Sequence, residues 1–179
     1  MFPLMHGTDA DLDDLSQYIG WFCQEKYRGV RLYWDGRHAW SRQGHEILLP
    51  DDWYESMPTI ALDCELYDGI DGERRCASVA RFGLKHVTPS MKIIAFDSPG
   101  HSHAPWDERN YQAWCAIQKA DFDRIEAAIL YSRIKSVDHM LATLKEVKDR
   151  GGEGLMLRKP GSFYQAGYSS DLVKLKHAV

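Results

Sequence analysis

Short runs of alternating polar and apolar residues, each closed by a turn, constrain the fold of this chain most strongly. GVRLYWDGRHAWSRQG, residues 29–44, predicts a hairpin, because Asp-Gly between β-prone segments favours a two-residue turn. Further strands are predicted at residues 59–69, 91–100, 129–134, 153–160 and 171–179. Many strands with few, unevenly placed helices indicate an α+β fold dominated by antiparallel sheet.

Three segments carry the apolar spacing of a helix instead. Residues 9–22 and 106–120 each predict one helix. The clearest pattern covers residues 136–151, where Ser136 is the expected N-cap and Gly151 the expected stop.

Composition limits the domain count and the classes of protein. The chain has 179 residues and no internal repeat or long linker, so we expect a single domain over residues 1–179. A net charge of −4 excludes a basic field over the whole domain. No apolar run approaches the roughly 20 residues of a membrane span, and the N-terminal residues are acidic, which predicts a cytoplasmic protein. Four cysteines without a Cys-x-x-Cys pair favour buried free thiols.

Alternation along two predicted strands gathers like charges on one face. It places Asp63 beside Glu65, and Lys174 beside Lys176. Either pair alone describes the solvated face of a half-buried strand, and Asp63 can equally cap a strand end.

A third group of charges surrounds Lys26, at the start of the hairpin run QEKYRGVRLYWDG. A solvated strand end is the ordinary interpretation of this lysine. If the Asp-Gly turn has two residues, Arg42 lies across from Gly29 and close to Lys26. With Arg31 and the glycine-flanked Glu153, the set suits phosphoryl chemistry. Carboxylates hold a divalent cation, cations bind phosphate oxygens, and an amine acts as the nucleophile.

Five motifs in order resemble the nucleotidyltransferase (adenylation) domain of ATP-dependent DNA ligases, especially the small bacterial and phage enzymes. KYRGVR stands where the family has Lys-x-Asp-Gly-x-Arg, and SRQG follows it. LDCELYDG resembles the Asp-x-Glu strand, IIAFDSPG the aromatic-Asp strand, and GGEGLMLRKPGSFYQAGYSSDLVKLK the last two motifs. The resemblance covers residues 24–176 and implies the covalent nucleotidyltransferase fold, with a nucleotide cleft between antiparallel sheets flanked by helices.

The resemblance implies a role for individual residues. Lys26 would attack the α-phosphate of ATP and carry AMP, while Lys174 and Lys176 would neutralise charge in the transition state. Phe96 would stack on adenine, although a core aromatic is the other interpretation of this residue. The implied nucleotide-binding set is Glu25, Tyr27, Arg31, Arg42, Glu65, Phe96, Glu153, Lys174 and Lys176.

The same resemblance implies a metal site and a DNA contact surface. Glu65 and Glu153 are the expected ligands of Mg²⁺, which prefers hard oxygens. The expected nucleic-acid contacts are Arg28, Arg42 and Arg158. His101 and His103 form a second candidate metal pair, but no third ligand is spaced nearby, which favours a polar loop.

Three features depart from the family pattern. Arg28 replaces the aspartate two residues after the lysine, and strand alternation aims it to the side of Lys26. Tyr168 stands where small bacterial ligases usually carry arginine. The chain ends three residues after Lys176, so the oligonucleotide-binding (OB) domain that normally follows is expected to be absent.

The function expected from this pattern is ATP-dependent sealing of nicks in duplex DNA, through AMP on Lys26 and an adenylated 5′-phosphate. The enzyme would use ATP and Mg²⁺ and act as a monomer in a bacterial or phage-infected cell, with a partner chain as one source of the missing clamp. Two alternatives stay open. One is a nucleotide- or DNA-end-binding module that has lost turnover, and the other is an RNA ligase or capping guanylyltransferase on the same scaffold.

Overall fold

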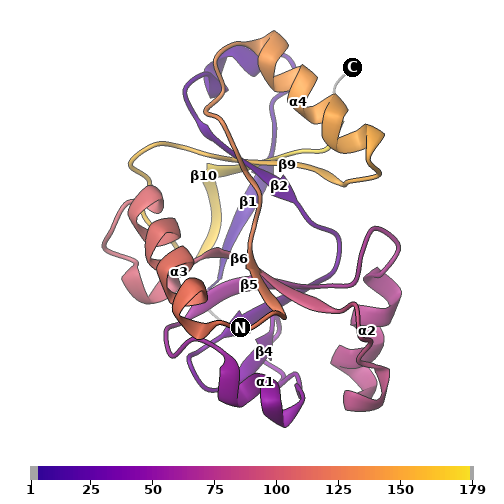
Figure 1. Ribbon diagram of the computed structural model, residues 1–179. Helices are drawn as coiled ribbons and strands as arrows, with labels where there is room; N and C mark the ends of the chain where they lie inside the picture. Colours follow the sequence, from indigo (N-terminus) through magenta and orange to yellow (C-terminus); the bar gives the residue numbers. More distant parts are fainter. Residues whose placement is uncertain (1–3, 178–179) are drawn as a thin grey trace.

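Two five-stranded sheets form the body of the molecule, in a computed structural model that describes residues 4–177 (Figure 1). The first sheet has the order β1-β10-β9-β2-β8 and the second the order β4-β3-β5-β6-β7. The strands of the first sheet are β1 (Met5–Asp9), β10 (Gly167–Leu175), β9 (Gly154–Arg158), β2 (Phe22–Lys26) and β8 (Leu130–Tyr131). The strands of the second are β4 (Ala39–Ser41), β3 (Val30–Trp34), β5 (Leu62–Tyr67), β6 (Lys92–Asp97) and β7 (Ile125–Ala127).

The helices lie outside the two sheets. The α-helices are α1 (Asp51–Ser56), α2 (Glu73–Phe82), α3 (Trp106–Ala120) and α4 (Val137–Asp149). Short 3₁₀ turns occur at η1 (Leu15–Tyr18), η2 (Leu84–His86) and η3 (Pro99–His101). The predicted α+β fold is confirmed: pairing is antiparallel except for β1 with β10 and β6 with β7.

The predicted hairpin is confirmed as β3 and β4, but its turn is longer than expected. Trp34 pairs with Ala39, so the turn holds four residues rather than two. The Asp35 carboxylate closes it by accepting two backbone N–H groups at 2.7 and 2.8 Å. The predicted position of Arg42 across from Gly29 is therefore wrong by two residues, a shift that keeps Arg42 on the same face of the sheet.

The helix predicted at residues 9–22 is wrong. This segment contains the end of β1, the turn η1 and the start of β2. Gly20 has φ +86°, which breaks a helix, and Leu12 and Ile19 of the expected apolar stripe are exposed. Pairing of β2 with β9 therefore outweighs the local helical spacing.

The other predicted elements are present with adjusted ends. The helices at residues 106–120 and 136–151 are α3 and α4. Ser136 Oγ caps α4 by accepting the His139 N–H at 3.1 Å, and Gly151 ends it with φ +84°. The strand at residues 129–134 shrinks to β8, and that at 171–179 is the second half of β10, with residues 178–179 outside the described part. No prediction covered β1, β7, α1 or α2.

Each sheet buries its apolar face against helices and turns its polar face toward the other sheet. One core packs α4 against Cys23, Leu155, Leu157, Val173 and Leu175 of the first sheet. The larger core packs α1, α2 and α3 against the second sheet through residues such as Leu32, Cys64 and Ile93. The side chains of opposite parity, including Lys26, Glu65 and Lys174, are thereby left to line the space between the sheets.

Two exclusions made from composition can be compared with the structure. All four cysteines are free and three of them are buried, as expected. In the part of the chain that the structure describes, no helix is long and apolar enough to cross a membrane.

Candidate active site

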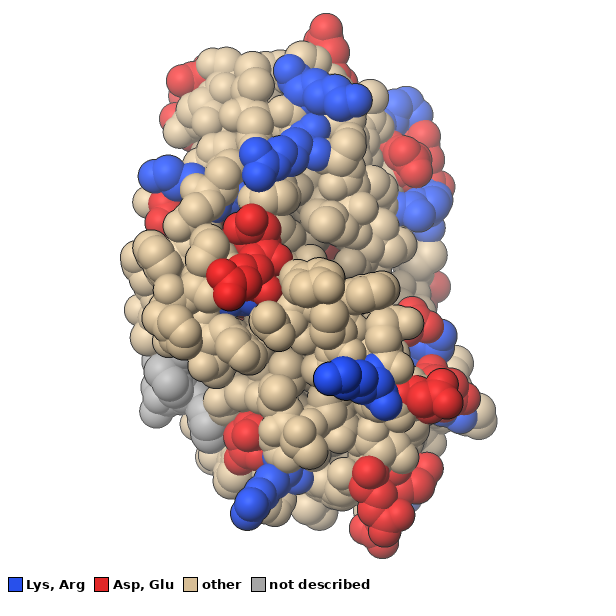
Figure 2. Space-filling view, turned by 60° about the vertical axis from the view of Figure 1, so that its left-hand side comes forward, with Lys and Arg blue, Asp and Glu red and all other residues tan. Residues whose placement is uncertain are grey.

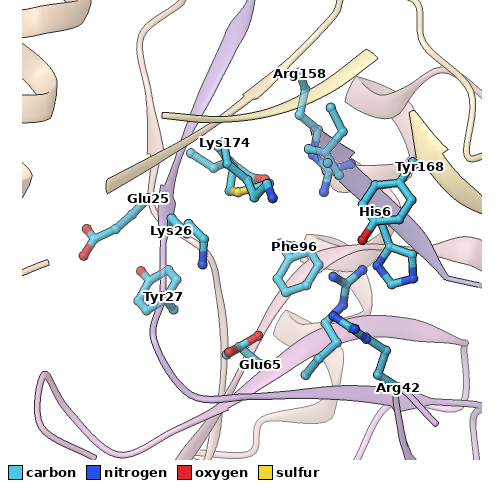
Figure 3. Close-up of a pocket in the computed structure, with 15 residues that line it drawn as sticks. His6, Glu25, Lys26, Tyr27, Arg42, Glu65, Phe96, Arg158, Tyr168 and Lys174 are labelled. Carbon is cyan, nitrogen blue, oxygen red and sulfur yellow. The ribbon is translucent and has the colours of Figure 1, made fainter. Parts of the chain in front are cut away.

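A pocket of about 210 Å³ lies between the two sheets (Figure 3). Its walls come from β1, β2, β9 and β10 on one side and from β3, β5 and β6 on the other. Nine of the predicted nucleotide- or DNA-contact residues line it: Glu25, Lys26, Tyr27, Arg31, Arg42, Glu65, Phe96, Arg158 and Lys174. The unforeseen His6, Gln24 and Met156 line it as well.

Lys26 is the last residue of β2, and its amine is held by a carboxylate. Nζ of Lys26 donates to Glu153 Oε2 at 2.6 Å, and Nζ of Lys176 donates to Oε1 of the same residue at 2.8 Å. Burial opposes ionisation of Glu153, but the hydrogen bonds from Lys176 and Lys26 prevail and lower its pKa. The predicted pair of Lys26 and Glu153 is thus one three-residue ion cluster with Lys176.

A close backbone contact brings this cluster together. Gly154 pairs with Lys26 across β2 and β9, and it has φ +150°. A Cβ at Gly154 would lie 2.4 Å from the carbonyl oxygen of Leu175, so only glycine allows β10 to approach here. The close approach of β10 therefore explains the glycine that follows Glu153.

Glu65 points from β5 toward Lys26 and Phe96 (Figure 3). Burial raises its pKa to about 7, against the charges of Arg31 and Lys26. One carboxylate oxygen accepts the N–H of Gly29 at 2.9 Å. A Cβ at Gly29 would meet the Leu66 carbonyl oxygen at 2.0 Å, so glycine is required for this approach. Glu65 is therefore a buried carboxyl group with a raised pKa, held at the pocket wall.

Arg31 is clamped in place on the second sheet. Its Nε and Nη2 donate to the two oxygens of Asp63, each at 2.5 Å, and Nη2 also donates to the Met5 carbonyl at 3.0 Å. The guanidinium lies 4.9 Å from the ring centroid of Phe96. Asp63, for which a strand-end cap was the other interpretation, is instead the buried partner of Arg31 and of the Tyr164 hydroxyl at 2.7 Å.

The other predicted lysine of β10 also has an acidic neighbour. Lys174 lines the pocket, and its Nζ lies 3.2 Å from Asp9 Oδ1 at the end of β1. Lys176 does not line the pocket and reaches the site only through Glu153.

Glu25 and Tyr27 flank Lys26 but differ in orientation. The side chain of Glu25 turns away from the pocket (Figure 3) and accepts hydrogen bonds from Tyr131 and Arg150, both at 3.0 Å. Tyr27 lines the pocket, and its hydroxyl accepts the Ile129 N–H at 3.2 Å. The backbone of Glu25, rather than its carboxylate, is what a ligand can meet.

The positions of Arg28 and Arg158 differ from those that the sequence predicted. Arg28 is exposed and does not line the pocket, because β2 ends at Lys26 and the strand alternation stops there. The prediction that Arg28 points to the side of Lys26 is therefore wrong. Arg158 is only 3% exposed and donates to Asp97 Oδ2 at 2.7 Å, so it is accessible to a ligand in the pocket rather than to a duplex outside it.

Two buried polar groups face the pocket, one on Gln24, which the sequence did not suggest, and one on Arg158, which was expected to contact DNA. Within residues 4–177, Gln24 Oε1 and Arg158 Nε are the buried side-chain atoms without a hydrogen-bond partner, and both residues line the pocket. Buried polar atoms are nearly always paired, so an unpaired acceptor and donor in one pocket indicate a missing ligand. Gln24 stands two residues before Lys26 on the same strand face, a signal that alternation offered.

A buried ion network joins the two sheets beneath the pocket. Asp97 of β6 accepts hydrogen bonds from Arg158 of β9 and, at 2.7 and 3.1 Å, from Arg109 of α3. Arg109 is fully buried and also donates to the carbonyl oxygens of Ala104 and Ser162. The relative position of the pocket walls therefore depends on a charge network that only the folded chain assembles.

The fit of a divalent cation can be judged from the donor set. Among the described residues, no group of three or more His, Cys, Asp or Glu side chains could hold a metal, which also argues against a site at His101 and His103. Mg²⁺, however, uses one or two carboxylates and completes its shell with phosphates and water. Glu65 lines the pocket, and Glu153 adjoins it through its hydrogen bond with Lys26. The charge of Glu153 contributes to the raised pKa of Glu65, so the oxygens of the two residues suit such an ion.

Two facing sheets, with a strand-end lysine in the pocket between them, match the fold of the nucleotidyltransferase domains in solved DNA ligase structures. Within that class, the chain resembles the adenylation domain of ATP-dependent DNA ligases in sequence and in fold. A curated DNA ligase of Haemophilus influenzae is 28% identical over 159 residues, which cover 89% of this chain and 59% of that ligase. The chain therefore spans less than two thirds of this relative's length. No protein-family model matches the chain.

Solved structures establish the fold independently. A Lig E DNA ligase, studied for DNA binding with a minimal scaffold, has a TM-score of 0.88 at 24% identity and covers 99% of this chain and 69% of its own. The DNA ligase-adenylate of Chlorella virus has a TM-score of 0.82 at 19% identity over 97% of this chain and 66% of its own. The predicted nucleotidyltransferase fold is confirmed.

Proposed function

We propose that this chain is the adenylation domain of an ATP-dependent DNA ligase, which forms AMP-lysine on Lys26 and passes the AMP to a 5′-phosphate of nicked duplex DNA. The position of Lys26 carries the proposal. Its amine faces a polar pocket between the sheets, within hydrogen-bond distance of Glu153 and beside Glu65 and Lys174. The resemblance to DNA ligases supports the choice of substrate.

The first step is displacement at the α-phosphate of ATP. The neutral amine of Lys26 forms a P–N bond, the bond from the α-phosphorus to the bridging oxygen breaks, and pyrophosphate leaves with the electron pair. Glu153 is the nearest group to accept the amine proton, since it already takes a hydrogen bond from Nζ. Lys174 faces the same pocket and offsets charge on the phosphate oxygens.

The base and the ribose have partners in the same pocket. Phe96 offers a ring face, with Arg31 fixed beside it by Asp63. Gln24 Oε1 is a buried acceptor without a partner, which suits the exocyclic amino group of adenine and disfavours the carbonyl of guanine. This acceptor supports ATP over GTP as the nucleotide.

Glu65 and Glu153 would hold Mg²⁺ together with phosphate oxygens. When bound, the ion would neutralise negative charge on the triphosphate and on the leaving pyrophosphate. The chain's own part is to hold Glu65 at the pocket wall beside Gly29, and Glu153 next to the pocket between Lys26 and Lys176.

In the later steps, an oxygen of the DNA 5′-phosphate would displace Lys26 from AMP, and the 3′-hydroxyl would then attack that phosphate and release AMP. Basic and acidic side chains alternate on the face shown in Figure 2, without a continuous basic surface. DNA affinity should therefore be weak and strongly salt-dependent. The predicted monomeric state, and a partner chain that completes the clamp, stay predictions.

The intact mass of the protein after incubation with ATP and Mg²⁺ tests the proposal. The wild type should gain one AMP and Lys26→Ala none. Lys145→Ala, which removes an exposed lysine of α4, is the matched control and should gain AMP like the wild type. Sealing of a nicked DNA duplex, compared with a nicked RNA and with GTP in place of ATP, then tests the substrate.

One observation favours a second candidate, a nucleotide-binding module without turnover. The family aspartate two residues after the lysine is replaced by Arg28, and the carboxylate of the neighbouring Glu25 turns away from the pocket to Tyr131 and Arg150. ATP binding without any AMP adduct would establish this second function and refute the first.

A further inference from the structure

Tyr168 is an exposed aromatic residue at the rim of the pocket. Its side chain is 76% exposed, the highest value among the large apolar residues of the described chain, yet it lines the pocket. Its hydroxyl has no hydrogen-bond partner within residues 4–177. The ring is therefore free to contact a ligand on one face.

The backbone holds Tyr168 in a defined place despite this exposure. Gly167 has φ +90°, and its N–H donates to the Leu4 carbonyl at 2.9 Å. Tyr168 pairs with His6 in the parallel register of β10 and β1, which shifts directly afterwards, between Gly7 and Thr8. Such bulges often direct a side chain at a site. A stacking surface that is fixed in advance loses little entropy on binding.

His6 supports the tyrosine from inside the pocket. The two ring centroids lie 5.5 Å apart with the planes at 46°. Burial, followed by the charges of Arg31 and Arg42, lowers the pKa of His6, so the imidazole is neutral at pH 7. His6 lies between Tyr168 and Arg42 (Figure 3).

We propose that Tyr168, backed by His6, stacks on the base of the DNA nucleotide that carries the 5′-phosphate at the nick. This inference rests on the proposed function for the identity of the ligand. Phe96 and the unpaired Gln24 lie deeper and suit the adenine of ATP, whereas Tyr168 lies at the rim with Arg42, where an incoming strand end would enter. Aromatic stacking tolerates any base. Salt does not screen it, whereas salt would screen the phosphate contact of an arginine at this position.

Binding of nicked duplex DNA, measured by fluorescence anisotropy without ATP and with EDTA, tests the proposal. Tyr168→Phe keeps the ring and should bind within twofold of the wild type. Tyr168→Leu should bind about tenfold more weakly, as loss of one stacked base predicts. Phe163→Leu, which removes an exposed ring outside the pocket, is the matched control and should not change the affinity.

An abasic nucleotide next to the 5′-phosphate locates the contact. It should weaken binding by the wild type about as much as Tyr168→Leu does, and should have no further effect on Tyr168→Leu. Tyr168→Arg should recover affinity at low salt, with a salt dependence steeper by about one phosphate contact.

The proposal is overturned if Tyr168→Leu binds like the wild type, if Phe163→Leu weakens binding equally, or if the abasic change is additive. Its failure is separable from that of the proposed function. An AMP adduct on Lys26 with no effect of Tyr168→Leu removes only the stacking role. A Tyr168-dependent, base-dependent affinity without any adduct retains the stacking role and removes ligase activity.

Discussion

Lys26 Nζ lies 2.6 Å from Glu153 Oε2, although 126 residues separate the two in the chain. Glu153, directly before β9, is shared with Lys176, so one carboxylate holds a lysine at the end of β2 and a lysine just after β10. The adduct that we propose on Lys26 would remove the charge from one of them. Formation of the adduct would therefore free one oxygen of Glu153 for another cation.

Glu153→Gln should lower the rate of AMP-adduct formation about 100-fold, because it removes the charge that holds Lys26 and the nearest proton acceptor. Quench-flow measurement of the adducted mass checks this expectation. The matched control is Glu146→Gln on the exposed side of α4. An equal rate in Glu153→Gln and the control would show that the ion cluster is not part of the reaction.

Glu65 should make the fold less stable as the pH rises. Its pKa is raised from 4.5 to about 7 in the folded chain, so the folded state binds more protons than the unfolded state between these values. Stability is therefore present below pH 4.5 and is lost as the pH rises through about 7, by at most about 3 kcal/mol. Urea unfolding of the wild type and Glu65→Gln at pH 5 and pH 8 should show this loss in the wild type alone. Parallel pH profiles would contradict the assignment.

Asp63→Asn should weaken ATP binding and the fold together. The change leaves Arg31 without its carboxylate partner, and a broken, largely buried ion pair costs about 2–4 kcal/mol. Tyr164→Phe, which removes only the hydroxyl that donates to Asp63, should cost about 1 kcal/mol and preserve ATP binding. Thermal unfolding and ATP titration separate the two effects, and equal losses in both variants would refute the clamp.

Gln24→Leu should destabilise the free protein by no more than about 1 kcal/mol, because Oε1 has no partner to lose and Nε2 loses a single hydrogen bond, to Asn110 Oδ1 at 3.4 Å. It should weaken ATP binding about tenfold while leaving GTP binding unchanged, since adenine presents an amino group at position 6 where guanine presents a carbonyl. Calorimetric titration with both nucleotides checks the ratio. An unchanged ratio would mean that the acceptor faces water rather than the base.

Arg28→Asp should change the rate of adduct formation less than threefold and stability by less than about 0.5 kcal/mol, because Arg28 is exposed and outside the pocket. A large gain in rate would instead show that the acid acts from this loop in the presence of ATP.

Local sequence was sufficient for much of the fold. Alternation in residues 62–67 assigned Asp63 and Glu65 to one face, and Ser136 with Gly151 bounded α4 at both ends. It failed where a distant strand decided the outcome. Residues 9–22 have helical spacing, but the two ends of this segment form strands instead. β1 pairs with β10, and β2 pairs with β9.

The pocket residues likewise divide into those that the sequence identified and those whose positions only the fold decided. Motifs and alternation identified Lys26, Glu65, Phe96 and Lys174 as a set, because side-chain period and residue type are properties of the chain itself. Only tertiary structure decided that Arg28 lies outside the pocket, that Arg158 is buried against Asp97, and that His6 meets Tyr168. Those three outcomes depend on where a strand ends, on a desolvated ion pair and on a parallel register, and each is set by residues far away in the sequence.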